Sequence, residues 1–172
     1  MILIRPAVAQ DAEAISHGHV ESWRTTYAGI VPVEYLAALN ETERVPLWRD
    51  WLAKDILTFV AELDGRVVGF ASGGANRESA QTYDAELYAI YLLQSAQRQG
   101  TGTALIKQLA ASLLSRDFKS MMVWVLEKNP STNFYAKSGA RVVTTKEIQI
   151  GGVTLSEVSY GWPDLAAILP GS

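Results

Sequence analysis

Two glycines that follow an apolar run are the residues with the clearest chemical use. Residues 87–93 are apolar at nearly every position, which is typical of a strand covered on both faces. Gly100-Thr101-Gly102 then opens a run with helical spacing, formed by Leu105, Ile106, Leu109 and Leu113. The first N–H groups of a helix have no intrahelical partner, and glycines let a phosphate come close to them. We therefore expect a diphosphate-bearing ligand over residues 97–103.

The spacing around these glycines separates the classes of nucleotide site. A Walker loop needs GxxxxGK[ST], and no lysine follows Gly102, so a nucleoside triphosphatase is not expected. A dinucleotide fingerprint needs GxGxxG/A, and Leu105 stands where its third glycine belongs. Glu127 lies where a ribose-binding acid would be, so an NAD-type dinucleotide enzyme stays open as an alternative. A plain turn with a helix N-cap is the other alternative.

Two longer segments resemble those of a known family. The run Gln97-Arg98-Gln99-Gly100-Thr101-Gly102 resembles the Q/RxxGxG/A acetyl-CoA signature of the GNAT family of N-acetyltransferases. Further along, residues 129–140 (NPSTNFYAKSGA) resemble the family's NxxAxxFYxKxGF segment, with Thr132 for the usual Ala and Ala140 for the usual Phe. The run AIYLL, residues 89–93, is similar to the family's splayed fourth strand. The resemblance implies one acetyltransferase domain over residues 1–172.

The resemblance implies direct transfer of an acetyl group from acetyl-CoA, as co-substrate, to a primary amine in a ternary complex. An amine with a pKa of about 10.4 is unprotonated in only about one molecule in 10³ at pH 7, so a proton acceptor is needed. Glu86 matches by spacing a general-base position of some family members, and a solvated strand-end carboxylate is the alternative. The chain has no cysteine, so no thiol acyl-enzyme is expected.

Tyr135 matches the family's tyrosine that contacts the CoA sulfur, so it is the expected catalytic acid. A phenol with a pKa of about 10 is a weaker acid than a thiol with a pKa of about 8.5. We therefore expect Tyr135 to stabilise the leaving thiolate by a hydrogen bond rather than by full proton transfer.

The resemblance also implies the acetyl-CoA contacts. The backbone of Ile90 and Leu92 would pair with the pantetheine arm, and the N–H of Leu92 or Leu93, at a bulge, would donate to the thioester carbonyl. Asn129 would contact the pantetheine. The phosphate loop would use Gln97, Arg98, Gln99, Gly100, Thr101, Gly102 and Thr103.

The acceptor site is less well defined by the sequence. The first two helices and the final hairpin wall it in the family, so Trp23 and Tyr27 are the expected acceptor-binding residues, although aromatic residues at helical spacing are also ordinary core. His19, four residues before Trp23, is expected to be structural, with a second base as the alternative. The expected acceptor is a small or amino-acid-like amine, with a protein amine as the second choice. A non-catalytic acyl-CoA-binding module of the same fold is the alternative function.

Composition agrees with one globular domain. The 172 residues are 48% hydrophobic, and the formal charge of −3 gives no reason to expect a nucleic-acid partner. No apolar run is long enough for a membrane span, and Arg5 and Pro6 interrupt the N-terminal apolar residues before a signal peptide could form. We expect a cytoplasmic protein with no metal site. The Trp- and Leu-rich segments fit either a homodimer interface or the core.

The elements expected around these residues alternate in type. Helices are expected over 11–27, 33–39, 42–54, 102–116 and 131–138, with Ser131 as a cap. Strands are expected over 2–4, 57–63, 66–75, 87–93, 121–126, 142–150 and 153–162. Asp64-Gly65 and Gly151-Gly152 predict tight hairpin turns. The fold class is α/β, with a mixed, mostly antiparallel sheet of about seven strands, flanking helices and splayed central strands, as in the acyl-CoA N-acyltransferase fold. The tail from Pro163 is expected to pack loosely.

Overall fold

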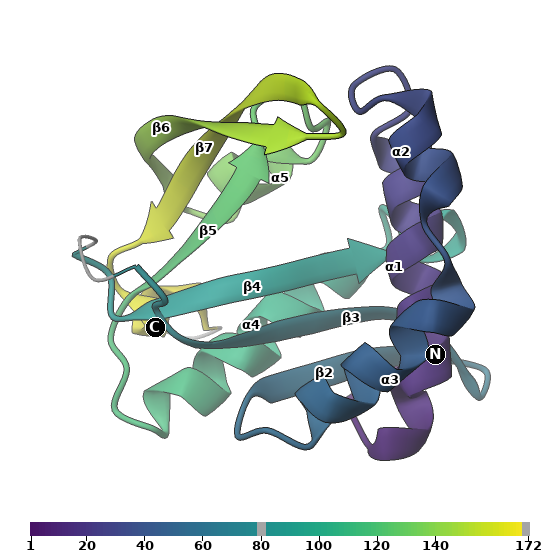
Figure 1. The fold of residues 1–172 in the computed structure, drawn as a ribbon. Helices are drawn as coiled ribbons and strands as arrows, with labels where there is room; N and C mark the ends of the chain where they lie inside the picture. The colour runs from purple at the N-terminus through teal and green to yellow at the C-terminus, as the bar shows by residue number, and fades with distance from the viewer. Residues whose placement is uncertain (79–81, 170–172) are drawn as a thin grey trace.

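A sheet with the strand order β1-β2-β3-β4-β5-β7-β6 runs through the molecule (Figure 1). The computed structural model describes residues 1–78 and 82–169. Neighbouring strands are antiparallel except β4 and β5, which are parallel, so the expected mixed sheet is confirmed. Its strands are β1 (Ile2–Pro6), β2 (Leu57–Leu63), β3 (Arg66–Ala75), β4 (Ala85–Leu92), β5 (Met121–Leu126), β6 (Arg141–Ile150) and β7 (Val153–Trp162).

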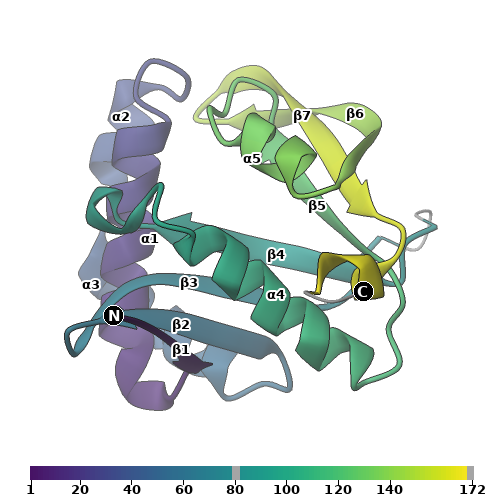
Figure 2. The same ribbon diagram turned by 180° about the vertical axis from the view of Figure 1, so that it is seen from behind.

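Helices cover both faces of this sheet (Figures 1 and 2). Helices α4 (Thr101–Leu114) and α5 (Thr132–Lys137) lie on the face that Figure 2 presents. Helices α1 (Ala12–Thr26) and α3 (Glu41–Leu52) lie on the other face, and α2 (Val33–Ala38) lies beside the β6–β7 turn. Within the described ranges, no helix has the length and apolar character needed to cross a membrane.

Both predicted hairpin turns are present and have the same backbone form. Asp64 and Gly65 have φ angles of 50° and 78°, and Gly151 and Gly152 have φ angles of 59° and 80°. Two positive φ angles match the twist of the flanking strands, which suits a two-residue hairpin turn. The second turn sets Ile150 opposite Val153 and therefore Lys146 opposite Glu157.

The central strands β4 and β5 are paired at one end only. Ala85 is opposite Met121 and Glu86 is opposite Met122, and beyond these two pairs the strands separate (Figure 1). The carboxylate of Asp84 holds the paired end, because its oxygens accept hydrogen bonds from the backbone N–H groups of Lys119 and Ser120, each at 2.8 Å. The splay predicted between these strands is thus confirmed.

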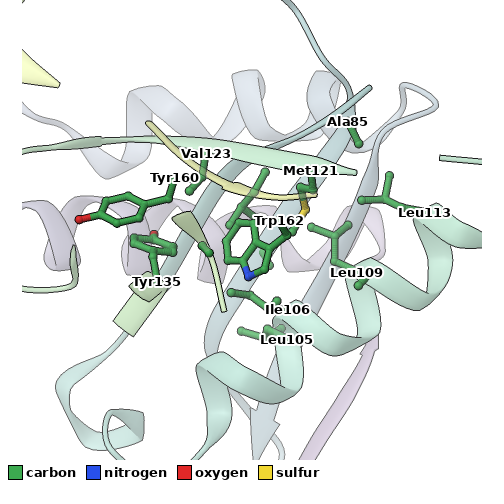
Figure 3. Close-up of a cluster of buried hydrophobic side chains, with 14 of the residues drawn as sticks. Ala85, Leu105, Ile106, Leu109, Leu113, Met121, Val123, Tyr135, Tyr160 and Trp162 are labelled. Atoms are coloured by element: carbon green, nitrogen blue, oxygen red, sulfur yellow. The ribbon is translucent and has the colours of Figure 1, made fainter. Parts of the chain in front are cut away.

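The main core lies between α4 and the sheet (Figure 3). Leu105, Ile106, Leu109 and Leu113 project from α4 at helical spacing, and all four are fully buried. The indole of Trp162 lies among them and donates to the backbone oxygen of Ser138 at 3.2 Å. This core fixes the start of α4 against the parted strands.

An aromatic cluster fills the space between α1, α3 and the other face of the sheet. The ring of His19 lies 5.9, 5.6 and 5.0 Å from the rings of Trp23, Trp48 and Tyr91. The buried Nδ1 of His19 has no hydrogen-bond partner among the described residues. Burial, and to a smaller extent the charge of Arg44, lower the pKa of His19 to about 4. His19 is therefore neutral at pH 7 and packs as an aromatic residue.

The structure differs from the sequence-based expectations in three local features. Pairing between β3 and β4 shifts between Ser72 and Gly73, so the bulge lies at Tyr88 and not at Leu92 or Leu93. The side chain of Ser131 occupies the N-cap position of α5 but makes no capping hydrogen bond. The described part of the tail is packed as well, because Leu165 in a short 3₁₀ turn (Leu165–Ile168) is fully buried, and residues 170–172 lie outside the described residues.

The buried histidine predicts a loss of stability in mild acid. Because the unfolded His19 binds a proton near pH 6.5 and the folded one only near pH 4, the free energy of unfolding should fall by about 2 kcal/mol between pH 7 and pH 5. His19→Phe should remove most of this fall in urea denaturation. His17→Gln, at the exposed histidine that pairs with Glu41, is the matched control and should keep it. An equal fall in the His19→Phe protein would contradict the assignment.

Candidate functional site

The start of α4 is built to leave backbone donors free. Gly100 is the N-cap with φ 79°, no side chain caps this end, and the first helical bond runs from Ala104 N to Gly100 O at 3.0 Å. The N–H groups of Thr101, Gly102 and Thr103 therefore precede the helical ladder at the positive end of the dipole. A Cβ on Gly102 would lie 3.2 Å from Cζ of Phe134, so glycine lets α5 approach this loop.

A first cavity of about 540 Å³ opens between the parted strands and this helix start. Most of the predicted acetyl-CoA contacts line it: Ile90, Leu92, Gln97, Arg98, Gly100, Gly102, Thr103, Asn129 and Tyr135. Leu93, Gln99 and Thr101 do not line the cavity. Leu93 uses its N–H in the sheet, donating to Val68 O at 2.9 Å, and so is not available to a ligand carbonyl. The Thr101 hydroxyl is buried without a hydrogen-bond partner among the described residues.

Tyr135 lies where α5 meets the first cavity. Its side chain is buried and stacks on the ring of Tyr160, with 5.8 Å between centroids (Figure 3). Burial raises the pKa of the Tyr135 phenol above its ordinary value, and Tyr27 raises it further. The described residues make no hydrogen bond to its hydroxyl, so Tyr135 enters the cavity as a neutral phenol with a proton to donate.

Asn129 connects this cavity to α1. Its Nδ2 donates to the hydroxyl of Tyr27 at 3.1 Å, and its Oδ1 accepts from the N–H of Ser131 at 2.8 Å. Burial raises the pKa of Tyr27 to about 12, although the bond from Asn129 opposes this. Asn129 thus positions two walls of the cavity in addition to any ligand contact.

A second cavity of about 520 Å³ lies on the other side of the parted strands. Glu86, Trp23 and Tyr27, the predicted base and acceptor-binding residues, all line it. The two cavities share one wall, formed by Tyr27, Tyr88, Tyr91, Trp124 and Val125. The two cavities are therefore adjacent, with only these side chains between them.

Glu86 is engaged by its own neighbour. Its carboxylate accepts from Nη2 and Nε of Arg77 at 2.8 and 3.1 Å, and from the Arg77 backbone N–H at 3.2 Å. The side chain of Glu86 is 4% exposed, whereas that of Arg77 is 58% exposed. Glu86 lines the second cavity, but both of its carboxylate oxygens already accept hydrogen bonds from Arg77.

A second charged group faces the same cavity from the β6–β7 hairpin. Nζ of Lys146 lies 2.6 Å from Oε1 of Glu78, 3.9 Å from Oε2 of Glu157 and 4.0 Å above the ring of Trp124. Burial raises the pKa of the Glu157 carboxyl, Lys146 opposes this, and Glu78 and Glu86 add to it. Sequence reasoning identified Glu78 as a loop acid compatible with an amine but did not single out Lys146 or Glu157, although the two-residue turn at Gly151-Gly152 fixes Lys146 opposite Glu157.

Comparison with known proteins agrees with this architecture. Residues 20–140 match the acetyltransferase (GNAT) family. The chain is 46% identical to the uncharacterized N-acetyltransferase YuaI of Bacillus subtilis (strain 168) over 169 residues, 98% of this chain and 96% of YuaI.

Solved structures share the fold at lower identity. A ribosomal-protein-alanine N-acetyltransferase of Brucella melitensis superposes with a TM-score of 0.74 at 21% identity, covering 94% of this chain and 99% of the other. YncA of Salmonella typhimurium, described with its cofactor acetyl-CoA, superposes with a TM-score of 0.71 at 17% identity, covering 95% and 94%.

The contacts of Glu86 predict a structural effect of its replacement. Glu86→Gln removes the charge from a buried acceptor of three hydrogen bonds, so the free energy of unfolding should fall by about 1–3 kcal/mol. Asp55→Asn breaks the exposed pair with Arg116 and should cost less than about 0.5 kcal/mol, which makes it the matched control. Urea denaturation of both variants measures the difference, and equal stabilities would refute the role given to this ion pair.

Proposed function

The chain belongs to the acetyltransferase (GNAT) family, and from that premise we propose that residues 1–172 form one N-acetyltransferase domain. It transfers the acetyl group of acetyl-CoA to a primary amine of a small molecule, directly and with both substrates bound. The ammonium ion first gives up a proton to water or to a carboxylate of the second cavity, and the neutral nitrogen then bonds to the acetyl carbon. The C–S bond breaks, CoA leaves as its thiolate, and the amide nitrogen loses its extra proton to solvent. The observation that carries this proposal is the pair of cavities on the two sides of the splayed strands, which share one wall. The first cavity takes the acyl donor and the second takes the acceptor.

The first cavity fits the chemistry of acetyl-CoA. The N–H groups at the start of α4 and the guanidinium of Arg98 suit its phosphates. Beyond Glu86, β4 has no partner strand on the β5 side, so its backbone groups near Ile90 can pair with an extended arm that carries amides. The sequence has no cysteine, which agrees with direct transfer rather than a thiol acyl-enzyme.

Tyr135 supports the departure of the thiolate. Its phenol is buried, neutral and without a hydrogen-bond partner among the described residues, so its proton is available to a sulfur in the first cavity. Since a raised phenol pKa lies above that of the thiol, about 8.5, the proton stays on Tyr135 and the hydrogen bond stabilises the charge. Acetyl-CoA itself supplies the activated acyl group.

Calorimetric titration tests the proposal most directly. Acetyl-CoA and CoA should bind with micromolar Kd, and NAD should give no signal. Gly102→Val should weaken acetyl-CoA binding about tenfold or more, because the added methyl groups push against Phe134 at the mouth of the cavity. Gly18→Ala, where a Cβ has open space, should bind acetyl-CoA as the unaltered protein does.

The outcomes of this titration separate the alternatives. Binding of NAD alone would overturn the proposed function. Acetyl-CoA binding without release of CoA thiol in the presence of any amine of a broad panel would favour the non-catalytic acyl-CoA-binding module.

Replacing the phenol tests the role of Tyr135. Tyr135→Phe should lower kcat by more than about tenfold, because one hydrogen bond to a developing charge is lost, and leave the Kd for acetyl-CoA within a few-fold. Steady-state thiol release and calorimetry give the two quantities. Tyr160→Phe, which keeps the stacked pair but alters the other ring, is the control. Unchanged kcat in Tyr135→Phe would remove this residue from the mechanism.

A further inference from the structure

The charges that line the second cavity are not equally satisfied. Glu86 is bound by Arg77, and Glu78 lies 2.6 Å from Nζ of Lys146. Glu157 lies 3.9 Å from the same Nζ, beyond hydrogen-bond distance, and the described residues form no hydrogen bond to its oxygens. Its side chain is only 15% exposed. The carboxylate of Glu157 therefore has little access to water and no hydrogen bond from the described residues, although Nζ of Lys146 lies at ion-pair distance.

The place of Glu157 in the sheet is fixed. It lies opposite Leu126 of β5 and opposite Lys146 of β6, so strands on both sides hold its backbone. The strand pairing fixes the face of the sheet from which this side chain projects, so the side chain stays on the side of the second cavity. Burial raises the pKa of Glu157 because the charged carboxylate is poorly solvated in this position. A cation bound beside it would stabilise the charged form.

Glu78, Trp124 and Glu157 form one corner of the second cavity, and Lys146 shows that this corner suits an ammonium group. Its ammonium is held above the indole of Trp124 and beside the carboxylate of Glu78. An aromatic face and a carboxylate together are a favourable environment for an alkylammonium ion. The remaining side of the corner is the carboxylate of Glu157.

The rest of the second cavity is apolar and aromatic. Trp23, Tyr27, Tyr88, Tyr91, Ile148 and Ile150 form its walls. Its two cations are already engaged, since Arg77 pairs with Glu86 and lies 4.4 Å over the ring of Tyr88, and Lys146 pairs with Glu78. A carboxylate on the acceptor would find no unengaged cation among these lining residues.

We propose that Glu157 receives the ammonium group of the acceptor, and that the acceptor is a primary amine on an aromatic or apolar body without a carboxylate. This inference rests on the proposed function and narrows it. Glu157 binds the cation, the aromatic walls bind the body, and the ammonium nitrogen lies near the wall shared with the first cavity. An amino acid of the same shape is rejected because its carboxylate meets Glu157 and Glu86 without a free counter-charge.

Two pairs of probes that differ only in the carboxylate test this proposal. Tyramine should exceed tyrosine, and phenethylamine should exceed phenylalanine, by about tenfold or more in kcat/KM for acetyl transfer. Glu157→Gln should raise the KM for tyramine about tenfold or more, with kcat and the Kd for acetyl-CoA changed only a few-fold. Glu157→Asp keeps the charge, so its KM for tyramine should lie between those of the unaltered protein and Glu157→Gln.

Controls separate binding from folding. Glu147→Gln, on the same hairpin but at an exposed position outside the cavity, should behave as the unaltered protein does. Since folding raises the pKa of the Glu157 carboxyl, its charge opposes folding at neutral pH, so Glu157→Gln should not lower the Tm.

The result can fail in distinguishable ways. Three outcomes would overturn this inference and leave the acetyltransferase function standing. One is a kcat/KM for tyrosine equal to that for tyramine, and another is an unchanged KM in Glu157→Gln. The third is no transfer to any of the four probes while acetyl-CoA still binds. Absence of acetyl-CoA binding in the unaltered protein would overturn the proposed function itself.

Discussion

Two parallel strands that are paired at one end and parted at the other determine the rest of this structure. The carboxylate of Asp84 bonds the N–H groups of Lys119 and Ser120 and holds the paired end. Beyond the paired end, β4 stays hydrogen-bonded to β3 and β5 stays hydrogen-bonded to β7. No pairing between β4 and β5 holds these two strands together there. Both cavities exist because backbone groups on the facing edges are left for ligands rather than for each other.

The two sides of this opening have different chemistry, and the difference follows from which elements reach them. The start of α4 and the buried phenol of Tyr135 line the first cavity, so this cavity offers hydrogen-bond donors. The second receives strand side chains from β4, β6 and β7, among them Glu86, Lys146 and Glu157. Donors suit an anionic acyl carrier, and carboxylates suit an amine, so each side is complementary to one partner of the proposed transfer.

The sequence predicted the fold well, and most of the residues that it singled out for acetyl-CoA line one cavity, because both signals are local. The boundaries of β2, β3, β5 and β7 were correct, since tight turns and alternating or continuous apolar runs define them. The ends of α1, α3 and α4 shifted by one or two residues, which is typical of fraying ends. The phosphate loop lies in one stretch of chain, so its residue types and spacing were readable together.

The charged residues of the second cavity could not be predicted in the same way, because they come from two distant parts of the chain, residues 77–86 and the β6–β7 hairpin. Arg77, Lys146 and Glu157 meet only once the sheet is formed, and nothing near Arg77 in the sequence indicates that it pairs with Glu86. The position of the bulge was also missed. It depends on how β3 and β4 pair, and the three glycines of β3 do not fix that register.

The wall shared by the two cavities has a consequence for how substrates are bound. Tyr27, Tyr88, Tyr91, Trp124 and Val125 contact both spaces, so any shift of these side chains toward one ligand changes the surface offered to the other. Thermodynamic linkage requires this influence to be equal in both directions: whatever factor the donor adds to the affinity for the acceptor, the acceptor adds to that for the donor. In the proposed transfer, the packing of these five side chains is therefore the route by which each substrate would change the affinity for the other.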